Sequence, residues 1–281
     1  MTAWQSPKPL PTPIAMSTRL PDPLPNSEPT PIPIPDRTSR HQPDQSIQDT
    51  QSKLPTPNLR FAIHDLTHSG ALKFQREISA GTALQEAIRT VIYLLYDTTG
   101  KTIDHPPVRS ITFILKSMGG VAYTTGNDLD DEHKEIHLSL EYIDAQPENR
   151  VRAEILGVIT HEMVHVWQWS APGTPGGLIE GIADYVRLKA GFSPPHWSRK
   201  PGEKWDAGYE RTGFFLEWLE QKFGSETIVQ INGLLKGERY ESKIWKEVFG
   251  HDVDDLFKTY QTEFEKRETI KEGNGTQPEH A

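Results

Sequence analysis

The chain has 281 residues, a formal net charge of −9 and no cysteine. The negative charge argues against nucleic-acid and membrane partners, which are bound through basic patches, and no apolar run approaches the roughly 18 residues of a membrane-spanning helix. Without cysteine no disulfide can form, and the ligands of any zinc site must be histidines or carboxylates.

The composition divides the chain into one domain with two tails. Residues 1–57 carry 14 of the 23 prolines, which predicts a disordered, extended segment, with a proline-rich ligand for SH3-like domains as the alternative. Residues 266–281 are charged and polar and predict a flexible tail. The domain is therefore expected over residues 58–265. The N-terminus lacks the basic segment and apolar stretch of a secretory signal, which favours an intracellular location without fixing the compartment.

The first half of this domain predicts a small sheet with one early helix. The helix is indicated by the apolar period of residues 80–96 and ends in the turn-forming residues 97–100. The strands are indicated by β-branched and alternating segments at residues 61–66, 108–116, 121–125 and 135–140.

The next helix carries the most informative motif of the chain. Residues 153–168 have the apolar spacing of a largely buried helix, and within it His161 and His165 lie one turn apart on one face. Glu162 stands beside the first histidine, in the His-Glu-x-x-His pattern of zinc hydrolases, where it accepts a proton from the attacking water. The alternative is a pair of buried histidines bonded to backbone or carboxylate groups.

A second helix is expected to complete the metal site. Prolines and glycines predict a loop at residues 170–177, and residues 178–190 then return to helical spacing. Catalytic zinc takes three protein ligands and a water. We assign Glu180 as the third ligand and Asp184, one turn later, as the acceptor for the outer N–H of a ligating histidine. The alternatives are that these two residues exchange roles, or that both are surface carboxylates. Gly181 lies between Glu180 and Asp184 and is expected to let the two metal-site helices approach each other.

The remainder of the domain reads as helical. Amphipathic segments predict helices at residues 206–223, from residue 225, and at residues 244–249 and 253–264. The fold class is therefore α+β: a small mixed sheet, then the His-Glu-x-x-His helix, then a helical bundle.

Two segments give this pattern a family resemblance. HEMVHVWQW at residues 161–169, with GGLIEGIADYVRL at residues 176–188, resembles the plant basic secretory protein family. The fungal and bacterial relatives of that family are associated with zinc metallopeptidases, and the resemblance implies a fungal or bacterial member. The resemblance runs from about residue 58 to about residue 264. The Glu-Gly-x-Ala element also resembles the third-ligand helix of gluzincin peptidases, whose glutamate binds zinc, and this supports Glu180. The family is often secreted, whereas this chain is acidic and shows no secretory signal.

The resemblance also implies a fold and further site residues. It implies a zincin-like metallopeptidase domain in which an edge strand, here residues 120–125, pairs with an extended peptide; ordinary sheet structure is the alternative. The segment WDAGYERTGFFLEW at residues 205–218 is similar to the family as well, and it puts Tyr209 in the position of a donor to the oxyanion. Tyr185 is the competing candidate, and helix packing is the alternative role for Tyr209.

Together these residues predict a zinc-dependent peptidase with one Zn²⁺ per chain and a peptide or protein substrate. The absence of a Gly-x-Met-x-Asn exopeptidase signature favours an endopeptidase. Two other functions are open: a non-enzymatic interaction protein that retains a structural zinc site, and a zinc hydrolase acting on other amides or esters. The residues do not determine the oligomeric state or the cleavage preference.

Overall fold

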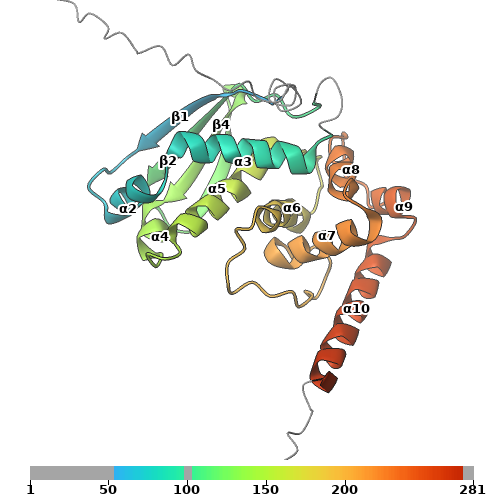
Figure 1. The fold of residues 1–281 in the computed structure, drawn as a ribbon. Helices are drawn as coiled ribbons and strands as arrows, with labels where there is room; N and C mark the ends of the chain where they lie inside the picture. The colour runs from blue at the N-terminus through green and yellow to red at the C-terminus, as the bar shows by residue number, and fades with distance from the viewer. Residues whose placement is uncertain (1–53, 98–102, 275–281) are drawn as a thin grey trace, which may run out of the picture. The chain divides into compact units, whose positions relative to one another are not determined.

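The computed structural model describes residues 54–97 and 103–274 (Figure 1). Residues 1–53 of the segment expected to be disordered therefore lie outside the described residues. The same holds for most of the turn predicted at residues 97–100 and for the last seven residues of the predicted tail. The described elements, in chain order, are β1 (Asn58–Ile63), α2 (Ser69–Glu77), α3 (Ala80–Leu95), β2 (Ser110–Lys116), β3 (Ala122–Asn127), β4 (Asp130–Ser139), α4 (Leu140–Ala145), α5 (Val151–Trp167), α6 (Gly176–Lys189), α7 (Tyr209–Phe223), α8 (Thr227–Leu234), α9 (Ile244–Phe249) and α10 (Val253–Asn274).

The four strands form one mixed sheet in the order β1-β2-β4-β3. β1 pairs with β2 and β2 with β4 in parallel, whereas β3 runs antiparallel to β4. The register shifts between Gly126 and Asn127, where the regular part of that last pairing ends. β3 is therefore an edge strand, as the family resemblance implies for residues 120–125.

Helices α3 and α5 pack against each other over one face of the sheet (Figure 1). The central strand β2 contributes Ile111, Phe113 and Leu115 to the core beneath them, all fully buried at alternate positions. The mixed α+β class is confirmed. The sheet matters for function because it fixes β3 alongside α5, the helix that carries both histidines.

Two short helices are missing from the sequence prediction, and the strands beside them are displaced. β1 begins at Asn58 and ends at Ile63, after which the ring of His68 accepts a hydrogen bond from the amide of Gly70 and starts α2. β4 ends at Ser139, whose hydroxyl accepts from the amide of Tyr142 and starts α4. In both places a side-chain cap starts a helix too short to show a helical period.

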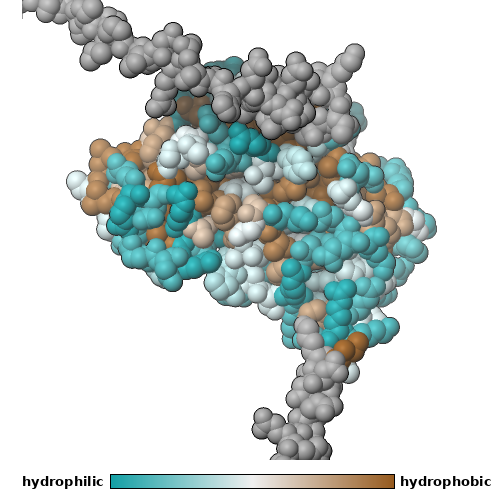
Figure 2. Space-filling model, viewed as in Figure 1, coloured by the Kyte–Doolittle hydropathy of each residue, from teal (hydrophilic) through white to brown (hydrophobic). Residues whose placement is uncertain are grey.

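The second half is helical, as expected, with shifted boundaries. α6 begins at Gly176, inside the predicted loop, and α8 begins at Thr227 rather than at residue 225. α7 begins at Tyr209 rather than at residue 206. α10 runs to Asn274, ten residues past the predicted end at 264, because charged helix-forming residues continue after the apolar spacing stops. The face seen in Figure 2 is mainly hydrophilic over α10. None of the described helices is both long enough and apolar enough to cross a membrane.

Candidate metal centre and catalytic cleft

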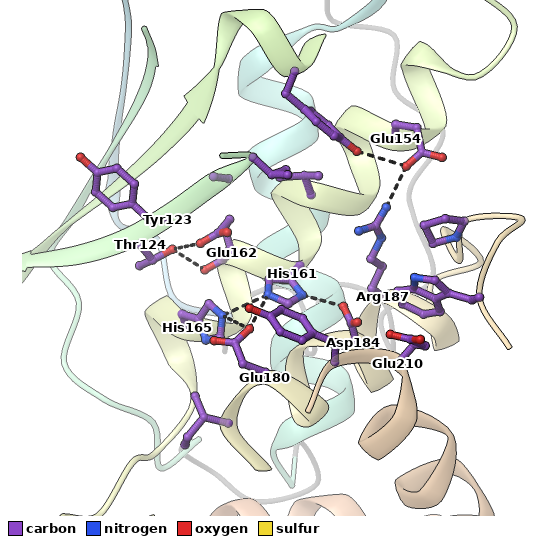
Figure 3. A pocket seen from close by; sticks show the side chains of 18 of the residues that line it. Tyr123, Thr124, Glu154, His161, Glu162, His165, Glu180, Asp184, Arg187 and Glu210 are labelled. Carbon is purple, nitrogen blue, oxygen red and sulfur yellow. Dashed lines mark hydrogen bonds and ion pairs between the residues drawn. The ribbon is translucent and has the colours of Figure 1, made fainter. Parts of the chain in front are cut away.

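Helix α5 holds the two histidines at the centre of the molecule. It is buried on almost every side, since it packs against the sheet, α3 and α6. His161 and His165 lie one turn apart on it, with ring centroids 4.9 Å apart and ring planes nearly perpendicular (Figure 3). The Nε2 atoms of the two rings are 3.2 Å apart and therefore face the same point.

Helix α6 brings a third candidate ligand to this point. Oε2 of Glu180 lies 3.1 Å from Nε2 of His161 and 3.6 Å from Nε2 of His165. These three residues are the one group of histidine and carboxylate side chains, among the residues that the structure describes, with ligand atoms close enough to hold a metal ion. The structure thus brings together the three residues that the sequence suggested as ligands.

Each histidine also has a partner on its outer nitrogen. Nδ1 of His161 lies 2.7 Å from Oδ1 of Asp184, where the sequence placed this carboxylate. Nδ1 of His165 lies 2.7 Å from the side-chain amide of Gln168, a contact that the sequence analysis did not anticipate. The spacing could have suggested it, because residue 168 follows His165 by three positions and shares its face of the helix.

Glu162 reaches toward the edge strand. The hydroxyl of Thr124, on β3, lies 2.7 Å from Oε2 of Glu162 and 3.0 Å from its main-chain carbonyl oxygen (Figure 3). The sequence analysis missed Thr124, and no local pattern marks it, because 38 residues separate it from Glu162. Only the strand order puts the two side by side.

Tyr209 stands at the mouth of the site in an unusual conformation. Its backbone φ of 45° is the one positive value among non-glycine residues in the described ranges, and such a conformation is strained for an aromatic residue. Its ring lies nearly parallel to that of His161, with centroids 6.4 Å apart, and 58% of the residue is exposed. Tyr185, the competing candidate, is buried beside Lys189 and Glu220 and does not line the cleft.

The glycines of α6 determine where Tyr209 sits. A Cβ on Gly177 would lie 1.9 Å from the carbonyl oxygen of Asp206, and a Cβ on Gly181 would lie 2.3 Å from Cγ2 of Thr212. Gly181 thus makes room for α7, and the expectation that it serves the contact between the two metal-site helices is wrong. On α5, Gly157 leaves room for a side chain of α6, since an added Cβ there would lie 2.6 Å from Nε of Arg187.

Charge concentrates at the candidate metal site. Burial lowers the pKa of His161, but the hydrogen bonds that its ring donates to Asp184 and Glu180 outweigh this effect and raise the pKa to about 9. For Glu180, burial raises the pKa, and hydrogen bonds with His161 and His165 outweigh this, so the net shift is downward. The negative charge of Glu180, followed by burial, raises the pKa of Tyr209. The phenol of Tyr209 therefore keeps its proton at neutral pH and can donate a hydrogen bond.

These residues line a cleft of about 860 Å³. One wall is formed by Val121, Ala122, Tyr123 and Thr124, at the edge of the sheet, and α5 and α6 form the floor. Trp197 also lines the cleft, as does the buried pair Arg187 and Glu154, whose side chains join α6 to α5 by a 3.0 Å ion pair. The cleft has room for a segment of peptide against the edge strand.

Fold and site together define a mixed α+β protein with a three-residue candidate metal centre in an open cleft. Residues 56–260 match the family described as peptidases of plants and bacteria, the BSP family, and the chain belongs to this family. The resemblance inferred from the two sequence segments is thereby confirmed, and a peptide or protein substrate follows from membership. No curated protein and no solved structure shows a significant match to the chain.

Proposed function

We propose that the protein is a zinc-dependent peptidase, with His161, His165 and Glu180 as metal ligands and Glu162 as general base. The observation that carries the proposal is the triangle of ligand atoms, with sides of 3.1, 3.2 and 3.6 Å. We assign the catalytic domain to residues 58–265, close to the family match. By its motif and its helix order the domain is zincin-like.

The donor set fits zinc. A tetrahedral zinc with ligands at about 2.1 Å separates its donor atoms by about 3.4 Å, which lies within the range of the three sides. A histidine that binds metal through Nε2 carries its proton on Nδ1 and needs an acceptor there. Asp184 supplies one for His161. For His165, the side-chain Nε2 of Gln168 faces Nδ1. Rotating the amide by half a turn exchanges its two atoms and makes Oε1 the acceptor; Oε1 is otherwise buried and has no hydrogen-bond partner among the described residues.

When bound, zinc supplies Lewis-acid chemistry, lowering the pKa of a bound water to about 7 and polarising a carbonyl group. Glu162 accepts the proton of the attacking water and passes it to the leaving amine. Tyr209 donates a hydrogen bond to the oxyanion that develops on the peptide carbonyl. We propose endopeptidase action because the edge strand can bind the main chain of an extended peptide over several residues.

The test combines metal content with activity on peptide substrates. Wild type should contain about one zinc per chain by mass spectrometry, and His165→Ala should lose it. Glu162→Gln should keep the zinc and lose hydrolysis by about 10²–10⁴-fold in kcat, as for removal of a general base. A Glu162→Gln protein as active as wild type would reject the base assignment. A wild type that binds zinc but cleaves no peptide would favour the structural-site alternative.

A further inference from the structure

The contact between Thr124 and Glu162 joins the edge of the sheet to the general base. We propose that Thr124 is a positioning residue for catalysis: its hydroxyl fixes the carboxylate of Glu162. This inference rests on the proposed function, which already assigns the main chain of an extended peptide to the edge strand that carries Thr124.

The role of the side chain follows from hydrogen-bond geometry. A threonine hydroxyl has one proton to donate. Of its two neighbouring acceptors, Oε2 of Glu162 at 2.7 Å is closer than the main-chain oxygen of the same residue at 3.0 Å. A bond to an ionised acceptor is also the stronger of the two. Thr124 therefore engages Oε2 and leaves Oε1 as the oxygen free to accept a proton.

The orientation of the backbone follows from the pairing of β3 with β4. The amide of Ser139 donates to the carbonyl oxygen of Val121, so this is a hydrogen-bonded pair of the antiparallel ladder. Such pairs alternate with non-hydrogen-bonded ones, which makes Tyr123 opposite His137 bonded, and Thr124 opposite Ile136 non-bonded. The amide and carbonyl of Thr124 therefore point away from β4, toward the open edge.

One residue thus joins substrate binding to the chemistry. A peptide that pairs with β3 meets the backbone of Thr124, and the hydroxyl of the same residue sets the position of Glu162 beneath it. A shift of the edge strand by the roughly 1 Å that matters in catalysis would displace the base as well. Removing the hydroxyl alone should lower kcat and leave KM nearly unchanged, because the backbone contacts remain.

The experiment compares three variants of the full chain loaded with zinc. Thr124→Val keeps the shape and strand preference of the side chain but removes the donor, and Thr124→Ser keeps the donor. Thr112→Val makes the same change on β2; Thr112 lies opposite Glu135 in the ladder, on the sheet face away from Thr124. Steady-state kcat and KM are measured on an extended peptide, and zinc content and melting temperature are recorded for each variant.

We expect Thr124→Val to lower kcat by about 10- to 100-fold, the range for loss of a hydrogen bond to a charged group, with KM within about twofold. Thr124→Ser should recover most of the loss, and Thr112→Val should match wild type. In a Glu162→Gln background, Thr124→Val should cause little further loss, because the two residues act as a unit.

An unchanged kcat in Thr124→Val, while Glu162→Gln is inactive, would overturn the role of Thr124 and leave the proposed function standing. Equal losses in the valine and serine variants, or losses accompanied by a lower zinc content, would assign Thr124 to packing instead. A zinc-loaded wild type that cleaves no peptide would overturn the proposed function, and the role of Thr124 with it.

Discussion

At the scale of single residues, the two histidines differ in the group that holds them. His161 faces the carboxylate of Asp184, whereas His165 faces the neutral amide of Gln168. Replacing Gln168 with leucine should weaken zinc binding by about 10- to 100-fold, the usual cost of losing the outer partner of a ligating histidine. Gln168→Glu keeps an acceptor and should retain affinity. Competition with a chelator measures the zinc affinity of both variants. A leucine variant that binds zinc as tightly as wild type would contradict the role of Gln168 as the outer partner of His165.

Spacing along one helix accounts for the part of the site that the sequence could predict. His161, Glu162 and His165 are neighbours within a single turn, and Glu180 and Asp184 repeat that spacing on the next helix. Thr124 reaches Glu162 only through the pairing of β3 with β4, and nothing local distinguishes it from other strand threonines. Contacts within an element could therefore be predicted, whereas the contact between two elements required the fold.

At the scale of elements, the junction of α6 with α7 carries Tyr209 and depends on Gly181. An added Cβ would overlap the side chain of Thr212, which cannot move freely because its hydroxyl accepts from the amide of Gly208 and donates to the carbonyl of Trp205. Gly181→Ala should therefore destabilise the fold by about 1–3 kcal/mol, as for overpacking, and lower activity by displacing Tyr209.

The matched control for this prediction is Gly233→Ala on α8. A Cβ at Gly233 meets nothing within 4 Å. Alanine there should raise stability by up to about 1 kcal/mol through helix propensity alone. Urea denaturation of both variants separates the two effects, since the substitution is the same and only the surroundings differ. Equal stability of the two variants would show that the α6–α7 junction has room for a methyl group.

The length of a helix largely decides whether its sequence could predict it. The long helices α3 and α5 have several turns of apolar spacing, and both were predicted to within a few residues. α2 and α4 start at the capping side chains of His68 and Ser139, and α4 has only six residues. The partner of Gly181 was predicted wrongly, because a small residue indicates close packing but not which neighbour approaches.

At the scale of the whole molecule, the proposed metal site should couple the stability of the fold to pH. In the metal-free chain the pKa of His161 is raised from 6.5 to about 9, so its contribution to stability is complete below 6.5 and is lost as the pH rises through 9. The pKa of Glu180 is lowered from 4.5, so its contribution is complete above 4.5 and is lost only in stronger acid. Between pH 6.5 and 9, the metal-free fold should therefore become less stable.

Zinc should cancel this loss, because binding displaces the proton of His161 and so becomes stronger as the pH rises. We expect the difference in melting temperature between zinc-loaded and chelator-treated protein to widen from pH 6.5 toward pH 9. Asp184→Asn removes a carboxylate that raises the pKa of His161, so its metal-free form should lose less stability over that range. Thermal denaturation across the pH series measures both effects. A zinc-dependent difference that stays constant or narrows with rising pH would mean that zinc and the proton do not compete for His161.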